Sequence, residues 1–89
     1  MKKVILASVL FAAASTAMAG PQCTEGKNDN WISEQDMQAR IAEMGYEVKK
    51  FKVSKGNCYE IYGWDKEGRK VEVYFHPETG EVVKSEIED

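Results

Sequence analysis

The sequence is poor in the residues that most enzymes and metal sites use: it has one histidine, two cysteines and two prolines among 89 residues. A single histidine, His76, leaves few ways to build a Ser/His or Cys/His nucleophile pair. One histidine and two cysteines are also too few soft ligands for a metal site. No C-x-x-C spacing is present, so neither a thioredoxin-like redox site nor haem attachment is indicated. We therefore predict a protein that is not an enzyme and carries no metal or cofactor.

Long apolar runs are also absent after the N-terminus. Lys2 and Lys3 precede an apolar stretch over residues 4–14, and Ala17-Met18-Ala19 has the small-x-small form of a cleavage site before Gly20. The stretch is shorter than the roughly 20 residues that span a bilayer. Residues 1–19 are thus predicted to be a secretory signal peptide. The mature chain is expected to be periplasmic or secreted, with no membrane insertion after cleavage.

Basic residues are the scarcer charge. Without Lys2 and Lys3, the remaining 70 residues carry ten basic and fifteen acidic side chains, a net charge near −5. Such a chain repels phosphate backbones, so nucleic acid is not an expected partner. Carboxylates are plentiful, Glu60 and Glu72 among them. We expect them to act as solubilising charge on a solvated strand face, with unperturbed pKa values.

The two cysteines are Cys23 and Cys58. In an oxidising compartment the expected state of such a pair is a disulfide. A bridge across 35 residues stabilises by about 3–4 kcal/mol in the chain-entropy model. Because a 70-residue domain has only a marginal core, this bridge is predicted to be a large part of its stability.

One helix is predicted, after a polar, irregular arm over residues 20–32. Its start is Ser33, whose hydroxyl can accept a hydrogen bond from the backbone N–H of Asp36. Gly45 then ends the helix as a left-handed cap. The residues at helical spacing form one apolar stripe: Met37, Ile41 and Met44. We interpret this stripe as core packing and not as a ligand set.

Four short strands follow. Residues 46–53 alternate, but the phase slips across Lys49-Lys50, which indicates a bulge. A three-residue hairpin loop closed by Asp65 and Arg69 aligns the next two strands, with Gly68 in the left-handed position. A final strand is expected over residues 81–85, with residues 86–89 as a frayed, charged tail. The predicted fold class is therefore α+β, with one helix packed on a four-stranded antiparallel sheet.

The register of the hairpin sorts the side chains into two faces. The inner face is expected to pack on the helical stripe with Val48, Phe51, Val53, Tyr59, Ile61, Val71, Val73 and Phe75. The outer face carries a candidate binding surface of Tyr62, Trp64, Lys70, Glu72 and Tyr74. Exposed aromatics of this kind mark partner surfaces. Alternatively, the arm covers them, because Cys58 is expected on the same side and its bridge would draw the arm, with Trp31, towards it.

The pattern "GYEVKKFKV…CYEIYGWDKEGRKVEVYFHPETGEVV" resembles the PepSY domain of secreted bacterial proteins. The likeness covers residues 33–84, and its most specific part is "VEVYF" followed by "P-x-T-G-E". His76 stands where the family commonly has aspartate. The resemblance implies a PepSY/cystatin-like layout for residues 33–89. It also implies a protein or peptide partner, with restraint of a secreted or envelope peptidase as the usual proposal.

Two functions are compatible with these residues. The first is a non-enzymatic periplasmic protein-binding or regulatory module that restrains a peptidase through the outer face or through an open sheet edge, since edges can accept an extended peptide. The alternative is a small envelope carrier of a ligand, haem or metal. It depends on His76, the methionines and the exported location.

Overall fold

The helix has the predicted boundaries. The computed structural model describes residues 20–88, and α1 spans Glu34–Glu43. The Ser33 hydroxyl accepts a hydrogen bond from the backbone N–H of Asp36 at 3.1 Å. At the other end, Gly45 has φ of +99° and its N–H donates to the carbonyl of Ala42 at 3.0 Å. Both caps are therefore confirmed.

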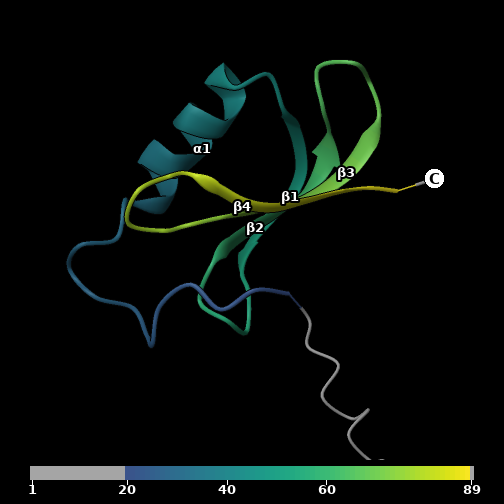
Figure 1. The fold of residues 1–89 in the computed structure, drawn as a ribbon. Helices are drawn as coiled ribbons and strands as arrows, with labels where there is room; N and C mark the ends of the chain where they lie inside the picture. Colours follow the sequence, from purple (N-terminus) through teal and green to yellow (C-terminus); the bar gives the residue numbers. More distant parts are fainter. Residues whose placement is uncertain (1–19, 89) are drawn as a thin grey trace, which may run out of the picture.

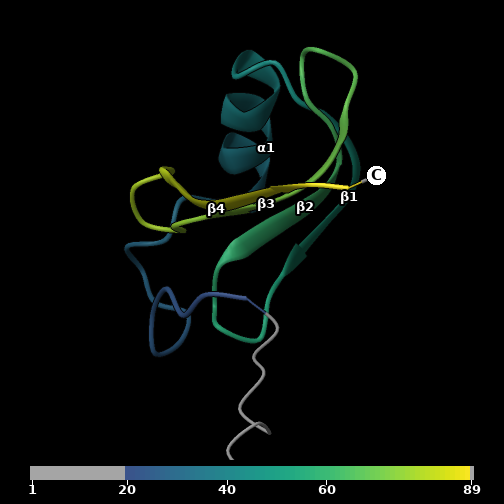
Figure 2. The same cartoon turned by 45° about the vertical axis from the view of Figure 1, so that its right-hand side comes forward.

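The four strands form a meander. They are β1 (Glu47–Val53), β2 (Tyr59–Trp64), β3 (Lys70–Phe75) and β4 (Val82–Ile87), and every neighbouring pair is antiparallel. The helix α1 lies on one side of the sheet, and the N-terminal arm runs past the far end, near the turn between β1 and β2 (Figures 1 and 2). The α+β prediction is confirmed. Within residues 20–88, no helix is both long enough and apolar enough to cross a membrane.

The central hairpin has the predicted register. The N–H of Asp65 donates to the carbonyl of Arg69 at 2.9 Å, and Gly68 has φ of +81°. Ile61 consequently faces Val73 across the two strands. A two-residue loop would have shifted one strand by a residue and turned its apolar side chains to the other face.

The bulge in β1 is also confirmed. The register of β1 against β2 shifts between Val48 and Lys50. After the shift, Phe51 lies opposite Ile61 and packs against the core, so both ends of the strand turn an apolar side chain inward. The extra residue thus corrects the phase slip seen in the sequence.

The core lies between α1 and the two central strands. The prediction that Val53 and Met44 belong to the core is wrong, because Val53 is 40% exposed and Met44 is 37% exposed. Val53 ends the edge strand β1, and Met44 is the C-cap of α1, so each lies beyond the overlap of helix and sheet. The fully buried cluster consists of Met37, Ile41, Tyr59, Ile61, Val71, Val73 and Phe75.

The residues just before the helix complete this core. The ring of Trp31 meets the ring of Tyr59 edge-on, with centroids 5.4 Å apart. The hydroxyl of Tyr59 donates to the carbonyl of Ile32 at 2.6 Å. The prediction that Trp31 follows the arm to the outer face is therefore wrong. Trp31 lies two residues before the helix cap Ser33, so the start of the helix fixes its position and the arm does not.

The last strand is longer than predicted. Ile87 lies opposite Val71, and the N–H of Glu88 donates to the carbonyl of Lys70 at 2.8 Å. The prediction of a frayed tail from residue 86 is therefore wrong, because the chain is paired with β3 as far as residue 88. The reason is that β3 offers its free backbone groups along its whole length, and an edge strand pairs with them without needing buried side chains.

The predicted disulfide is present. Cys23 and Cys58 are joined, with their Cα atoms 5.2 Å apart. Beside the bridge, the N–H of Cys23 donates to the carbonyl of Gly56 at 2.7 Å. The arm is therefore held to the turn between β1 and β2 by a covalent bond and by backbone pairing.

Candidate functional site

The five candidate residues lie together on the sheet face that points away from α1. Tyr62 faces Glu72, and Trp64 faces Lys70, across the pairing of β2 with β3. Tyr74 is next along β3 but is only 4% exposed, whereas Tyr62 and Trp64 are half-buried. The outer face therefore has two parts: a carboxylate pocket around Tyr74 and an aromatic hollow around Trp64.

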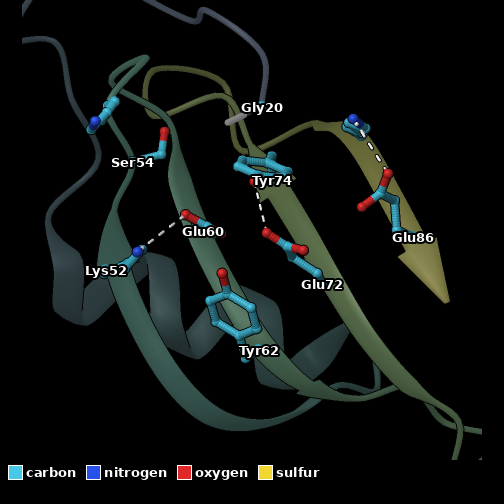
Figure 3. A pocket seen from close by; sticks show the side chains of 10 residues that line it. Gly20, Lys52, Ser54, Glu60, Tyr62, Glu72, Tyr74 and Glu86 are labelled. Atoms are coloured by element: carbon cyan, nitrogen blue, oxygen red, sulfur yellow. Dashed lines mark hydrogen bonds and ion pairs between the residues drawn. The ribbon is translucent and has the colours of Figure 1, made fainter. Parts of the chain in front are cut away.

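The carboxylate pocket encloses about 360 Å³, and the side chains of Glu60, Tyr62, Glu72 and Tyr74 point into it (Figure 3). The hydroxyl of Tyr74 donates to Glu72 Oε2 at 2.7 Å. Glu60, from β2, lies opposite Tyr74 and lines the same pocket as Glu72. Two carboxyl groups and two phenols thus form one cluster in this pocket.

Glu60 is not the solvated residue that the sequence suggested. It is only 3% exposed, so that prediction is wrong. Burial raises its pKa above the usual value, and the hydrogen bond with Glu72 acts in the same direction. The same hydrogen bond lowers the pKa of Glu72, with help from the Tyr74 hydroxyl. Glu60 is therefore the harder of the two carboxyls to ionise.

The phenols of the cluster respond to these carboxyls. The hydrogen bond to Glu60 raises the pKa of Tyr62 to about 12. Burial raises the pKa of Tyr74, and its hydrogen bond to Glu72 adds to the effect. Both phenols therefore stay protonated near neutral pH and serve as hydrogen-bond donors.

Replacing Tyr74 with phenylalanine is expected to lower the free energy of unfolding by about 1.5 kcal/mol at pH 7, because a hydrogen bond to a charged group is lost. That bond helps to lower the pKa of Glu72. Its contribution is present above the pKa of the unfolded glutamate, about 4.3, and is lost as the pH falls through the lower folded value. Urea unfolding between pH 3 and pH 7 measures this difference.

Tyr46→Phe is the matched control, because Tyr46 is on the inner side of the sheet, with its ring 6.0 Å from that of Phe75. Its effect should not change with pH over this range. A Tyr74→Phe effect that is equally large at pH 3 and pH 7 would show that the hydroxyl does not act through Glu72.

The aromatic hollow, of about 260 Å³, is bordered by Tyr62, Trp64 and Lys70 and by two lysines of β1, Lys49 and Lys50. Half-exposed aromatic rings beside cationic side chains are a typical composition for a protein contact surface. Of the five candidate residues, Tyr62, Trp64 and Lys70 border this hollow, while Glu72 and Tyr74 belong to the other pocket.

The arm covers only the carboxylate pocket. Gly20 lies against the ring of Tyr74, close enough that a β-carbon there would be 2.6 Å from ring atoms. Sequence reasoning missed Gly20, Lys52 and the burial of Glu60 as parts of the site. The hairpin register already placed Glu60 beside Tyr74, but Gly20, which lies against the Tyr74 ring, comes from a segment 54 residues earlier in the chain.

The residues behind the carrier alternative have other surroundings. Met37 is fully buried in the core. His76 accepts, through Nδ1, a hydrogen bond from the N–H of Glu78 at 3.2 Å. In the part of the chain that the structure describes, no three His, Cys, Asp or Glu side chains gather as metal ligands would.

The fold and site define a small disulfide-bridged α+β domain whose outer sheet face carries two pockets. A model of the family described as peptidase propeptide and YPEB domain matches residues 3–86, and the chain belongs to this PepSY family. Domains of this family are generally non-catalytic, inhibitory modules. The match includes most of the segment predicted to be a signal peptide. Searches of curated proteins and of solved structures found no match to this chain.

Proposed function

We propose that this protein is an exported, non-enzymatic module that binds a peptidase of the cell envelope or the secreted fraction and restrains it. Its membership of the peptidase propeptide family is the observation that carries the proposal. The binding surface in this proposal is the aromatic hollow around Trp64, because it combines half-exposed rings with an open cavity.

The charged residues around the hollow indicate which kind of partner surface would be complementary to it. The chain as a whole is acidic, yet lysines outnumber acids around this cavity, which is bordered by Lys49, Lys50 and Lys70 and by Glu88. Complementary charge favours specificity and a fast approach of the partner. The peptidase surface that fits here is therefore apolar at its centre and carries carboxylates around it.

The proposal is tested on the exported proteins of the source organism. The purified chain is added to that fraction, and cleavage of labelled casein is measured over a range of concentrations. Wild type is expected to reduce cleavage, and Trp64→Ala with Lys70→Ala should need at least about tenfold more protein, since anchoring aromatics often contribute 2 kcal/mol or more. Tyr74 is left intact because it is buried.

Val82→Ala is the matched control: it shortens an apolar side chain that is 45% exposed on the edge strand β4. It should inhibit like wild type. If wild type leaves cleavage unchanged, restraint of a peptidase is excluded. If the Trp64 variant inhibits as well as wild type while the Val82 variant does not, the contact is at the sheet edge and not in the hollow.

A further inference from the structure

The geometry points to the Glu60–Glu72 cluster as a binding site for one primary ammonium group, and to the chain's own α-amine at Gly20, formed by removal of the leader, as its occupant. This inference depends on the predicted cleavage after Ala19 and is independent of the proposed peptidase partner. It concerns the carboxylate pocket only, which the Proposed function does not use.

Gly20 is already seated at the pocket. It is one of the residues that line it, and it lies next to the Tyr74 ring, with the carboxyls of Glu60 and Glu72 beyond that ring (Figure 3). A β-carbon on Gly20 would be 2.7 Å from the Tyr74 hydroxyl oxygen. That oxygen is itself 2.7 Å from Glu72 Oε2. With ordinary bond lengths, the Gly20 nitrogen is therefore within about 8 Å of the Glu72 carboxylate.

The seat is held from two sides. The bridge at Cys23 fixes the arm three residues further on, and Cys58 Sγ lies 3.4 Å from the carbonyl oxygen of Pro21. Gly56 is packed so closely against the Pro21 carbonyl that a β-carbon there would collide with it. Residue 20 therefore has little freedom to leave the pocket while the disulfide is intact.

The positive charges of the pocket are exposed. Three lysines, Lys52, Lys55 and Lys84, line it together with three glutamates, and all three lysines are exposed. Lys52, from β1, is 3.9 Å from Glu60, and Lys84, from β4, pairs with Glu86 at 3.4 Å. Burial raises the pKa of Glu60. Because a buried carboxyl ionises more readily beside a cation, an ammonium group inside the pocket would favour the ionised form of Glu60.

Cleavage would change the chemistry of the Gly20 nitrogen and free it to turn towards the carboxyls of the pocket. Before cleavage the nitrogen belongs to a peptide bond, which is neutral and has one N–H. After cleavage it is an ammonium group with three donors and a full positive charge. Charge-assisted hydrogen bonds of this kind are about twice as strong as neutral ones. Removal of the leader would therefore complete the ion cluster and stabilise the folded arm.

The test compares two forms of the chain that begins at Gly20. One is the exported, leader-processed protein, whose mass establishes where it starts. The other has the same sequence, made by chemical ligation at Cys58, with the α-amine acetylated. At pH 7 the free-amine form is expected to melt about 4 °C higher or more. The gain should persist below the pKa of a free α-amine, about 7.7–8.0, and disappear as the pH rises through the higher folded value.

Variants identify the acids involved. Glu72→Gln should reduce the difference in melting temperature between the two forms to about 1 °C or less, whereas Glu86→Gln, at the exposed rim of the same pocket, should leave it unchanged. If Glu72→Gln does not fold, the ¹⁵N shift of the Gly20 amine in wild type decides, because it should titrate above the ordinary range. Equal melting temperatures of the two forms at pH 7, ordinary titration of that amine, or a processed chain that starts elsewhere would each overturn the inference.

Discussion

Replacing Cys23 and Cys58 together with serine is expected to lower the free energy of unfolding by about 3–4 kcal/mol. The bridge closes a loop of 35 residues, so its loss gives the unfolded chain more freedom. Small domains have about 5–15 kcal/mol of stability in total. Urea unfolding followed by tryptophan fluorescence measures the change, and reduction of the wild type should reproduce it.

The same replacement also tests the arm. Without the bridge, the arm is expected to leave the carboxylate pocket, so the amide protons around Tyr74 and Glu60 should exchange faster with solvent while those of α1 remain protected. If the free energy of unfolding of the double variant is less than 1 kcal/mol below that of wild type, the bridge is not a large part of the stability of this small domain.

Gly63→Ala is expected to lower the free energy of unfolding by about 3 kcal/mol, the upper end of the range for overpacking. Gly63 is buried near the end of β2 and faces Val48 of β1. A β-carbon there would collide with the carbonyl oxygen of Glu47, and would lie 3.1 Å from the Val48 Cα. These atoms belong to the backbone and cannot turn aside, so β1 must separate from β2.

Gly26→Ala is the matched control, because a β-carbon at Gly26 has no neighbouring atom within 4 Å. It is expected to leave the stability unchanged or to raise it slightly through the unfolded chain. Chemical unfolding of both variants under one set of conditions gives the comparison. Equal stabilities for the two alanine variants would mean that β1 can move away from Gly63 at no cost.

Local features of the fold could be predicted because their causes lie close together in the chain. The cap at Ser33, the turn at Gly45 and the hairpin loop before Arg69 each depend on a few neighbouring residues. The register of β2 against β3 follows from that loop and from the alternation of apolar side chains. The bulge at Lys49-Lys50 could be predicted for the same reason: without it, Phe51 would face solvent.

The site could be predicted only in part. The register placed Tyr62, Trp64, Lys70, Glu72 and Tyr74 on one face, and the structure agrees. It did not reveal that Tyr74 and Glu60 are buried, because strand alternation says which side a residue faces and not what lies above it. Trp31 was assigned to the wrong face for a related reason: the arm turns between Cys23 and the helix, and no local pattern marks where.

By itself, the sequence determined the elements, their order, the hairpin register and the pairing of its two cysteines, since these depend on short-range chemistry or on a single possible partner. Only the tertiary structure decided that the outer face is two sites. That division comes from Gly20 lying on Tyr74, a contact between residues 54 positions apart. Such a contact depends on where the disulfide and the β1–β2 turn hold the arm in space, and the burial of Glu60 is likewise a property of the packed structure that strand alternation does not reveal.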